Sequence, residues 1–207
     1  MGMITNFKAG GLRLEDVALK AAPFLSVPDN FSVPMWVDSR PLCIETSNQG
    51  AESSCAGFTT AGYREVLEWK KTHIKKQYDG SECYRKAKEL DGDNEWGTSL
   101  SQAINAAKAL GWFDPAAPVR QLSSKLDVQF ALHSKDVVIA GFRITGGWNA
   151  CDPSSGLIGE ATSPIGGHAV LICYYDQQTI GWQNSWGDTW GHKGFGRMTW
   201  EQFNSQF

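Results

Sequence analysis

The sequence has no long hydrophobic run and no secretion signal. No stretch approaches the roughly 18 consecutive apolar residues that a transmembrane helix requires. Residues 1–8 lack the basic region followed by an apolar region that marks a secretory signal peptide. We therefore expect a cytoplasmic protein with no membrane partner. A protein encoded by a virus or phage and located inside the host cell fits this expectation as well.

Patterns for metal or nucleic-acid binding are missing as well. The five cysteines include no CxxC pair, no HExxH sequence occurs, and the acidic residues at 91–95 lack the glutamate that closes an EF-hand loop. We therefore expect no metal ion, no cofactor and, in a reducing compartment, free thiols. The net charge of −3 gives the chain no overall attraction for nucleic acid.

What the sequence does contain is the composition of an ordinary globular protein. Of its 207 residues, 42% are hydrophobic and 20% are charged, which argues against a disordered chain or a coiled coil. The length predicts one domain or two closely packed lobes. We expect the protein to be a monomer.

The first half of the chain predicts helices. One is expected from about Ser54 to Lys76, capped by Ser53 or Ser54 and ending in a basic run that suits the helix dipole. The next is capped by Thr98 or Ser99 and stopped by Gly111. Its apolar stripe consists of Leu100, Ala103, Ile104, Ala107 and Leu110.

The second half predicts strands. A β-branched run at 137–142 predicts a buried strand, and residues 145–167, rich in glycine, proline and serine, predict a loop. Three more strands are expected at 169–175, 179–185 and 195–199. Helices followed by an all-β half, without βαβ alternation, predict an α+β fold with two segregated parts.

Three residue types that support thiol catalysis occur in a suitable order. Cys55 begins the first predicted helix, where unpaired N–H groups and the positive helix end stabilise a thiolate. His168 enters one predicted strand and Asn184 leaves the next, so antiparallel pairing brings them together. Each alone has a structural explanation: a buried small residue, a core histidine and a turn residue. Together, in this order, they favour nucleophilic catalysis.

The segments around these residues resemble the papain-like cysteine peptidases. The likeness rests on Asn48-Gln49-Gly50 before Cys55, on Gly167-His168-Ala169-Val170, and on Asn184-Ser185-Trp186-Gly187 followed by Trp190-Gly191. Residues 33–40 resemble the start of the mature enzyme, so the likeness runs from about residue 33 to the C-terminus. Residues 86–100 are similar to the shorter prokaryotic and viral-type members of the family.

The resemblance implies a papain-like, two-lobed α+β fold. Residues 33–207 would form the peptidase domain, with a helical lobe at about 41–120 and an antiparallel β lobe at about 121–207. The active-site cleft would lie between the lobes. Residues 1–32 would be an N-terminal arm or a short pro-like extension, since the long pro-segment of the family is missing.

The resemblance also implies catalytic roles. Cys55 would attack the substrate carbonyl as a thiolate, and His168 would carry the proton to the leaving amine. Asn184 would orient the imidazole. Gln49 would donate a side-chain N–H to the oxyanion, together with the backbone N–H of Cys55.

Three further residues are expected on the substrate-binding side. Gly97 would belong to a platform along which an extended substrate lies, and Ala169 would line a specificity pocket. Trp186 would shield the hydrogen bond between His168 and Asn184 from water.

The sequence departs from the family pattern around the nucleophile. Glu52 stands where secreted relatives have a disulfide-forming cysteine, and Ala56 stands where they have a tryptophan. His168 and Asn184 follow Cys55 at intervals shorter than the family's roughly 130–150 residues, which predicts trimmed loops in the β lobe.

The sequence therefore predicts a cysteine-type peptidase that hydrolyses a protein or peptide substrate through an acyl-enzyme thioester. One alternative is a deamidase or acyl transferase that uses the same thiolate chemistry on another amide. The other is a non-catalytic binding module with the same fold. The presence of Gln49, Cys55, His168 and Asn184 together counts against the binding module.

The arm carries a pattern of its own. The spacing of Leu14, Val17, Ala18 and Ala21 predicts a short amphipathic helix, which Pro23 ends. A helix this short is marginal in water, so it should pack on the rest of the protein. Docking on the flank of the domain is favoured over occupation of the cleft by residues 24–27, because the connector to residue 33 is short.

Overall fold

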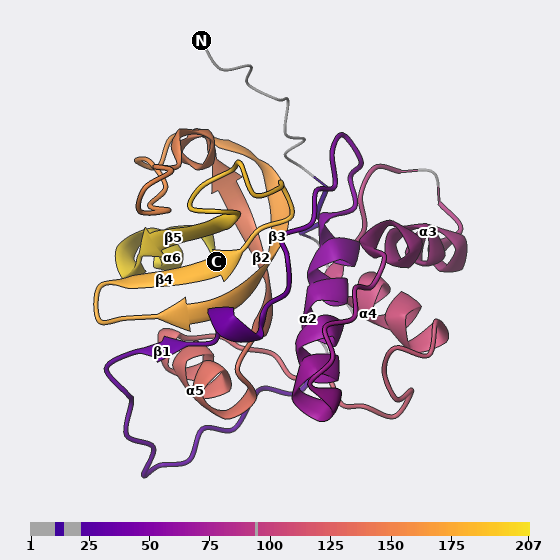
Figure 1. The fold of residues 1–207 in the computed structure, drawn as a ribbon, viewed down its shortest axis with the longest axis horizontal. Coiled ribbons are helices and arrows are strands. Elements are labelled where there is room, and N and C mark those ends of the chain that lie inside the picture. Colours follow the sequence, from indigo (N-terminus) through magenta and orange to yellow (C-terminus); the bar gives the residue numbers. More distant parts are fainter. Residues whose placement is uncertain (1–10, 15–21, 94) are drawn as a thin grey trace.

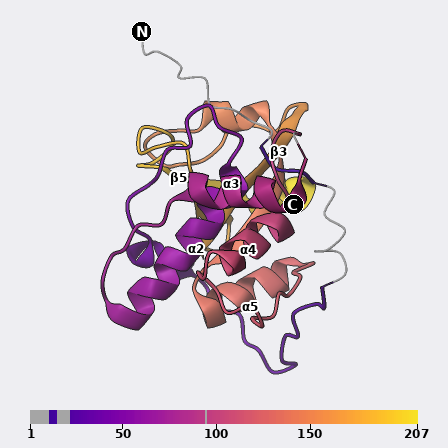
Figure 2. The same cartoon turned by 90° about the vertical axis from the view of Figure 1, so that its right-hand side faces the viewer.

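A computed structural model of the chain describes residues 11–14, 22–93 and 95–207. A group of helices lies beside an antiparallel sheet (Figure 1), as the expected α+β class requires. The helical side contains α2 (Cys55–Thr72), α3 (Gly80–Asp91) and α4 (Leu100–Ala109), which pack on one another (Figure 2). Helix α2 also packs on the sheet, and it therefore joins the two sides.

The sheet is organised around its longest strand, β3 (Pro164–Tyr175). One edge of β3 pairs with β2 (Val138–Thr145) and with the short β1 (Val37–Asp38), and the other edge pairs with β4 (Thr179–Gln183). Strand β5 (Phe195–Thr199) lies beyond β4, and all these pairings are antiparallel. The β3–β4 pairing places Gln183, the last residue of β4, opposite Leu171, so the chain that leaves β4 continues toward His168.

Strand β3 begins at Pro164, earlier than the expected Ala169. Gly166 and Gly167 pair with Ile144 and Arg143 of β2. Glycine has low strand propensity, so this first half was expected to be loop. His168 therefore lies inside the strand and not at its start.

The second half of the chain is not all-β, contrary to expectation. Helix α5 (Lys125–Lys135) packs on β2 and β3, and α6 (Trp200–Gln206) packs on β2, β4 and β5 (Figure 1). Short 3₁₀ turns occur at Arg40–Leu42 and Gly146–Ala150. The apolar residues of α5 do not form one clear stripe, since Leu126 is exposed while Val128 and Leu132 are buried, so no helical pattern is evident in the sequence there.

The ends of the expected helices are set by local backbone geometry. Helix α4 has the predicted cap, because the Ser99 side chain accepts the N–H of Gln102 in a capping box. Helix α2 ends at Thr72, before the expected Lys76, because His73 takes a left-handed conformation with φ of 57°. No helix in the described part of the chain is long and apolar enough to cross a membrane.

The main core lies on the β side and is rich in aromatic rings. Trp148 and Trp182 stack with ring centroids 4.6 Å apart, and Phe142 and Phe203 pack beside them. Trp186 extends this cluster toward His168. The aromatic core therefore forms one wall around the histidine predicted to be catalytic.

Removal of the α5 cap should destabilise the protein. The Ser124 side chain accepts the N–H of Asp127 at 3.1 Å. We expect Ser124→Ala to lower the free energy of unfolding by about 1 kcal/mol, because a helix N-terminal N–H loses its partner. Urea denaturation measures the change, and the exposed Ser26→Ala serves as the control. Equal stability of the two variants would contradict the role of the cap.

Candidate active site

Cys55 is the first residue of α2, and its thiol is completely buried. Burial raises the pKa of the Cys55 thiol to about 11, while the backbone N–H groups of Ala169 and Ala56 act in the opposite direction. The Ala169 N–H contact places the sulfur beside β3, next to His168. In this closed arrangement the thiol is protonated at neutral pH.

His168 is held by Asn184, as the order of the two residues predicted. The His168 Nε2 and Asn184 Oδ1 atoms lie 2.7 Å apart, and both side chains are buried. Asn184 Oδ1 also accepts the backbone N–H of Ser185 at 2.8 Å, which identifies this atom as the carbonyl oxygen. Nε2 must therefore carry the proton, so in the neutral ring Nδ1 is the proton acceptor.

The other ring nitrogen, Nδ1, is buried and forms no hydrogen bond with any described residue. No hydrogen bond therefore joins His168 to Cys55 in this arrangement. Burial lowers the pKa of His168 to about 4, and the bond to Asn184 opposes this shift. Thiol and imidazole are thus a neutral pair here, and not a thiolate and an imidazolium.

Aromatic rings keep water away from the His168–Asn184 hydrogen bond. The Trp186 ring lies 4.5 Å from the His168 ring, centroid to centroid, and Trp148 meets the imidazole edge-on at 5.9 Å. Trp186 is only 1% exposed. The shielding expected of Trp186 matches this position, whereas a direct contact with substrate does not.

Gln49 is fixed by two side-chain hydrogen bonds. Its Oε1 accepts the hydroxyl of Ser185 at 2.7 Å, and its Nε2 donates to the Glu52 carbonyl at 2.7 Å. A primary amide carries two N–H groups, so one remains for another acceptor. Sequence reasoning gave no role to Ser185, although it lies inside the Asn184–Gly187 motif. The structure shows that Ser185 positions both Gln49 and Asn184.

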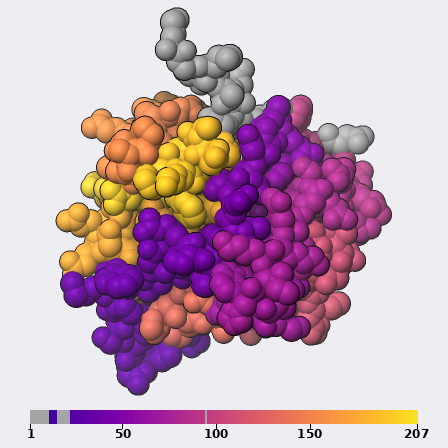
Figure 3. Space-filling model, in the orientation of Figure 1, coloured from indigo at the N-terminus to yellow at the C-terminus, as the bar shows by residue number. Residues whose placement is uncertain are grey.

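Residues 11–13 lie in extended form between the helical side and β3. The Leu12 N–H donates to the Gly167 carbonyl at 3.2 Å. Thr98 donates its N–H to Gly11 at 3.1 Å and accepts the N–H of Arg13 at 3.0 Å. The Leu12 side chain is buried in the same apolar cluster as Cys55 and Ala169. In the space-filling view, indigo to purple residues from the first quarter of the chain lie along the boundary between the two sides (Figure 3).

Two glycines allow this close approach. A Cβ atom at Gly97 would lie 2.2 Å from the Gly11 carbonyl oxygen, and one at Gly167 would lie 2.4 Å from the Leu12 oxygen. Gly97 therefore lies along the extended segment, but the main-chain hydrogen bonds are made by its neighbour Thr98. Gly167 and Thr98 are contacts that sequence reasoning missed, because both act through backbone atoms.

The position of the arm agrees with the expectation in one respect and differs from it in another. Residues 24–27 do not occupy the cleft: Leu25 and Pro23 exchange backbone hydrogen bonds with Gln121, and Phe24 is 62% exposed. This agrees with the favoured placement on the flank, whereas the cover that residues 11–13 form over Cys55 was not expected. Of the expected amphipathic helix, Val17, Ala18 and Ala21 lie outside the described residues.

An ion pair holds the covering segment. The Arg13 guanidinium donates to both carboxylate oxygens of Asp93, at 2.6 and 2.7 Å, and also to the Glu95 carbonyl at 3.1 Å. Lys88 contacts the same carboxylate. The two cations hold the pKa of Asp93 well below its usual range. In the described part of the chain, no group of three or more His, Cys, Asp or Glu is placed to hold a metal.

Buried His168 should make stability depend on pH. Its pKa is about 4 when folded and 6.5 when exposed, so between these values only the unfolded chain binds the proton. We therefore expect the free energy of unfolding to fall as the pH is lowered from about 6.5 to about 4. Urea denaturation across this range measures the slope, and His168→Gln should flatten it.

Glu65 acts with the opposite sign and must be removed from the comparison. Burial raises its pKa to about 7, so its folded form binds the proton that the unfolded form releases above pH 4.5. The comparison is therefore made between Glu65→Gln and the double variant Glu65→Gln/His168→Gln. Glutamine at position 65 keeps an acceptor for the Tyr78 N–H. The same slope with and without His168 would show that the imidazole is not buried in its neutral form.

Solved structures share this fold, although no protein-family model and no curated protein matches the sequence. Xylellain, a cysteine protease from Xylella fastidiosa, has a TM-score of 0.76 at 19% identity over 94% of this chain and 91% of that chain. Procathepsin B S9 from Trypanosoma congolense has a TM-score of 0.68 at 13% identity, over 92% and 80%. Digestive procathepsin L 3 from Tenebrio molitor has a TM-score of 0.62 at 18% identity, over 94% of this chain and 70% of that chain. The chain therefore has the fold of the papain-like cysteine proteases.

Proposed function

We propose that the protein is a cysteine-type peptidase that hydrolyses peptide bonds in a protein or peptide substrate. The observation that carries the proposal is the state of His168. Asn184 holds its Nε2, its Nδ1 is a buried acceptor, and the Cys55 thiol lies against the next residue, Ala169. The imidazole thus has one nitrogen fixed by a hydrogen bond and the other able to accept a proton, and a thiol lies nearby at the N-terminus of a helix. This arrangement fits nucleophilic catalysis.

The chemistry follows from these positions. The Cys55 proton moves to His168 Nδ1, and the thiolate attacks the carbonyl carbon of the scissile bond. The oxyanion that forms is stabilised by the remaining N–H of Gln49 and by the backbone N–H of Cys55. His168 then protonates the leaving amine, and a thioester with Cys55 remains. Water, deprotonated by His168, attacks the thioester and releases the carboxylic acid and the thiol.

The groove occupied by residues 11–13 favours a peptide substrate over a small amide. Thr98 and Gly167 bind the segment through its main chain, and any extended peptide offers the same donors and acceptors. The Leu12 side chain lies against Leu100, Gly141 and Ala169. An aliphatic substrate side chain fits this position, because the surroundings are apolar.

The peptidase proposal is tested by digestion of a mixed peptide library, with the products identified by mass spectrometry. Hydrolysis leaves a free carboxyl end and a new amino end at each site. Transfer of the acyl group to another amine, or loss of ammonia from a side chain, gives different masses. These products would support the acyl transferase or deamidase in place of the peptidase.

Substitution of single site residues should separate their roles. We expect Cys55→Ala to abolish cleavage and Gln49→Ala to lower kcat by roughly 100- to 1,000-fold, because an oxyanion donor is lost. Asn184→Ala should lose less than Cys55→Ala, since packing against Trp186 still orients the imidazole. Cys151→Ala is the matched control. Cleavage that persists in purified Cys55→Ala would refute this nucleophile.

Release of the covering segment should raise activity. Arg13→Ala removes the ion pair with Asp93, and Leu12→Asp places a charge in the apolar cluster around Cys55. We expect both variants to have a higher kcat/KM on a fluorogenic peptide and a lower Tm, because substrate no longer competes with residues 11–13. Arg85→Ala is the control, since that arginine lies on the exposed surface of α3. Unchanged kcat/KM in both variants would show that the segment does not compete.

A further inference from the structure

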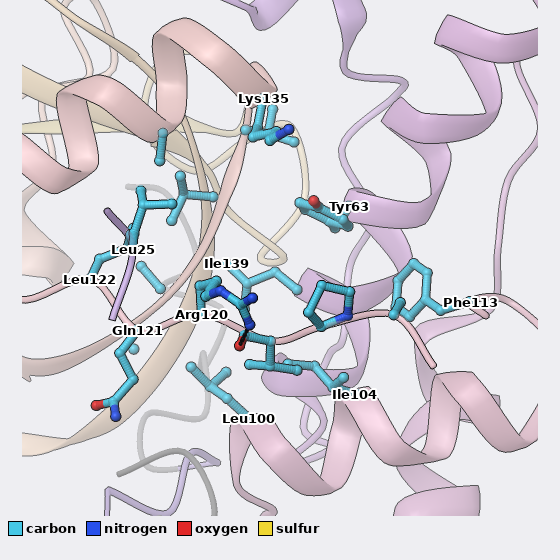
Figure 4. A pocket seen from close by; sticks show the side chains of 18 of the residues that line it. Leu25, Tyr63, Leu100, Ile104, Phe113, Arg120, Gln121, Leu122, Lys135 and Ile139 are labelled. Atoms are coloured by element: carbon cyan, nitrogen blue, oxygen red, sulfur yellow. Dashed lines mark hydrogen bonds between the residues drawn. The ribbon is translucent and has the colours of Figure 1, made fainter. Parts of the chain in front are cut away.

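A cavity of about 570 Å³ lies between the helical side and the sheet, behind the segment that covers Cys55 (Figure 4). Helix α4, strand β2, helix α5 and the chain at 117–122 contribute to its walls, and residues 12–14 line it as well. Its volume falls within the range of small-molecule sites, about 300–1,000 Å³. Leu12, Leu100 and Gly141 belong both to this cavity and to the groove proposed for the substrate, so the cavity adjoins that groove. The rest of the lining has no part in the proposed catalytic steps, and the cavity has room for a second ligand.

The walls of the cavity are largely apolar. Leu25 and Leu122 face it from one side, and Leu100, Ile104 and Ile139 face it from the other (Figure 4). Water has few hydrogen-bond partners in such a space, and an empty apolar cavity costs stability. A hydrocarbon chain would fill the space and remove this cost.

The charged residues that line the cavity all carry the same sign. They are Arg13, Lys108, Arg120 and Lys135, and none of the described lining residues is Asp or Glu. This is notable in a chain whose net charge is −3. The lining therefore selects for an anion in addition to an apolar group.

The four cations differ in how far the protein already engages them. Arg13 pairs with Asp93, and the Lys108 ammonium donates to the carbonyls of Pro115 and Ala117. Arg120 and Lys135 form no ion pair with any described carboxylate; one Arg120 N–H donates to the carbonyl of the adjacent Val119 at 3.1 Å, and the guanidinium carries further N–H groups for a ligand. Asp136, the neighbour of Lys135, is already paired with Lys70. The Arg120 guanidinium, which extends over the cavity in Figure 4, is the better placed partner for an anion.

We propose that this cavity binds a single-chain amphiphilic carboxylate of the fatty-acid type. The hydrocarbon chain lies between the two apolar walls, and the carboxylate pairs with the planar guanidinium fork of Arg120, with Lys135 as a second cation. Because residues 12–14 line the same cavity, the bound chain contacts the segment that covers Cys55. The inference concerns binding alone and does not rest on the proposed peptidase activity.

Calorimetric titration of the full chain with octanoate, decanoate and dodecanoate, each below its micellar concentration, tests the proposal. We expect saturable one-to-one binding whose affinity rises about fourfold for each added methylene. Dodecanol should bind more weakly than dodecanoate. Arg120→Gln should weaken dodecanoate binding roughly tenfold and leave dodecanol unaffected, because only a charge-assisted hydrogen bond is lost.

A second variant tests the position of the hydrocarbon chain. Ile104→Trp fills the cavity and should abolish binding of both dodecanoate and dodecanol. If Ile104→Trp does not fold, Ala117→Phe is used in its place. Arg85→Gln, on the exposed surface of α3, should bind like the unaltered protein. The absence of saturable binding overturns the proposal. The proposal is also overturned if dodecanoate binds equally well to the unaltered protein, to Arg120→Gln and to the variant with the filled cavity. Equal affinity of the protein for dodecanoate and for the cation dodecyltrimethylammonium overturns it as well.

Discussion

The buried hydrogen bond between His168 and Asn184 is the constraint on which the site is built. It requires β3 and the end of β4 to lie side by side, which the antiparallel register from Leu171 and Gln183 provides. It also requires a dry environment, which Trp186 and the aromatic core of the β side supply. Ser185 adds a second N–H to the same Asn184 oxygen and reaches Gln49 with its hydroxyl. One short segment after β4 therefore fixes the base and the amide of Gln49 together.

Local signals in the sequence were sufficient to predict an element whose start and end are set by residues within or next to it. Helix α4 carries its cap at Ser99 and its stop at Gly111, and β5 was expected at the residues where it occurs. The start of β3 could not be recognised, because Gly166 and Gly167 have no strand propensity and are held there by β2. Helix α5 was missed although Ser124, three residues before Asp127, has the spacing of a helix N-terminal capping motif.

The site shows a similar division between side chains and backbone. The order of His168 and Asn184 in the sequence, together with the residues around them, was enough to predict their contact, because it depends on the chemistry of their side chains; Cys55 lies beside Ala169, the neighbour of His168. Thr98 and Gly167 were not foreseen, since they act through a carbonyl or an N–H that every residue possesses. The cover formed by residues 11–13 depends on the fit of Leu12 among Cys55, Leu100 and Ala169, which exists only after the two sides have assembled.

Burial of the site links the occupation of the groove to the charge states of Cys55 and His168. With Leu12 in place, the low dielectric raises the pKa of Cys55 and lowers that of His168, so the neutral pair is favoured. If residues 11–13 leave the groove, the main-chain groups of Thr98 and Gly167 become available to a peptide, and water reaches the thiol and the imidazole. Hydration favours both charged forms, so transfer of the Cys55 proton to His168 becomes easier as the segment leaves. Occupation of the groove by residues 11–13 and the charge state of Cys55 are therefore coupled, and in the covered form the thiol is both inaccessible and protonated.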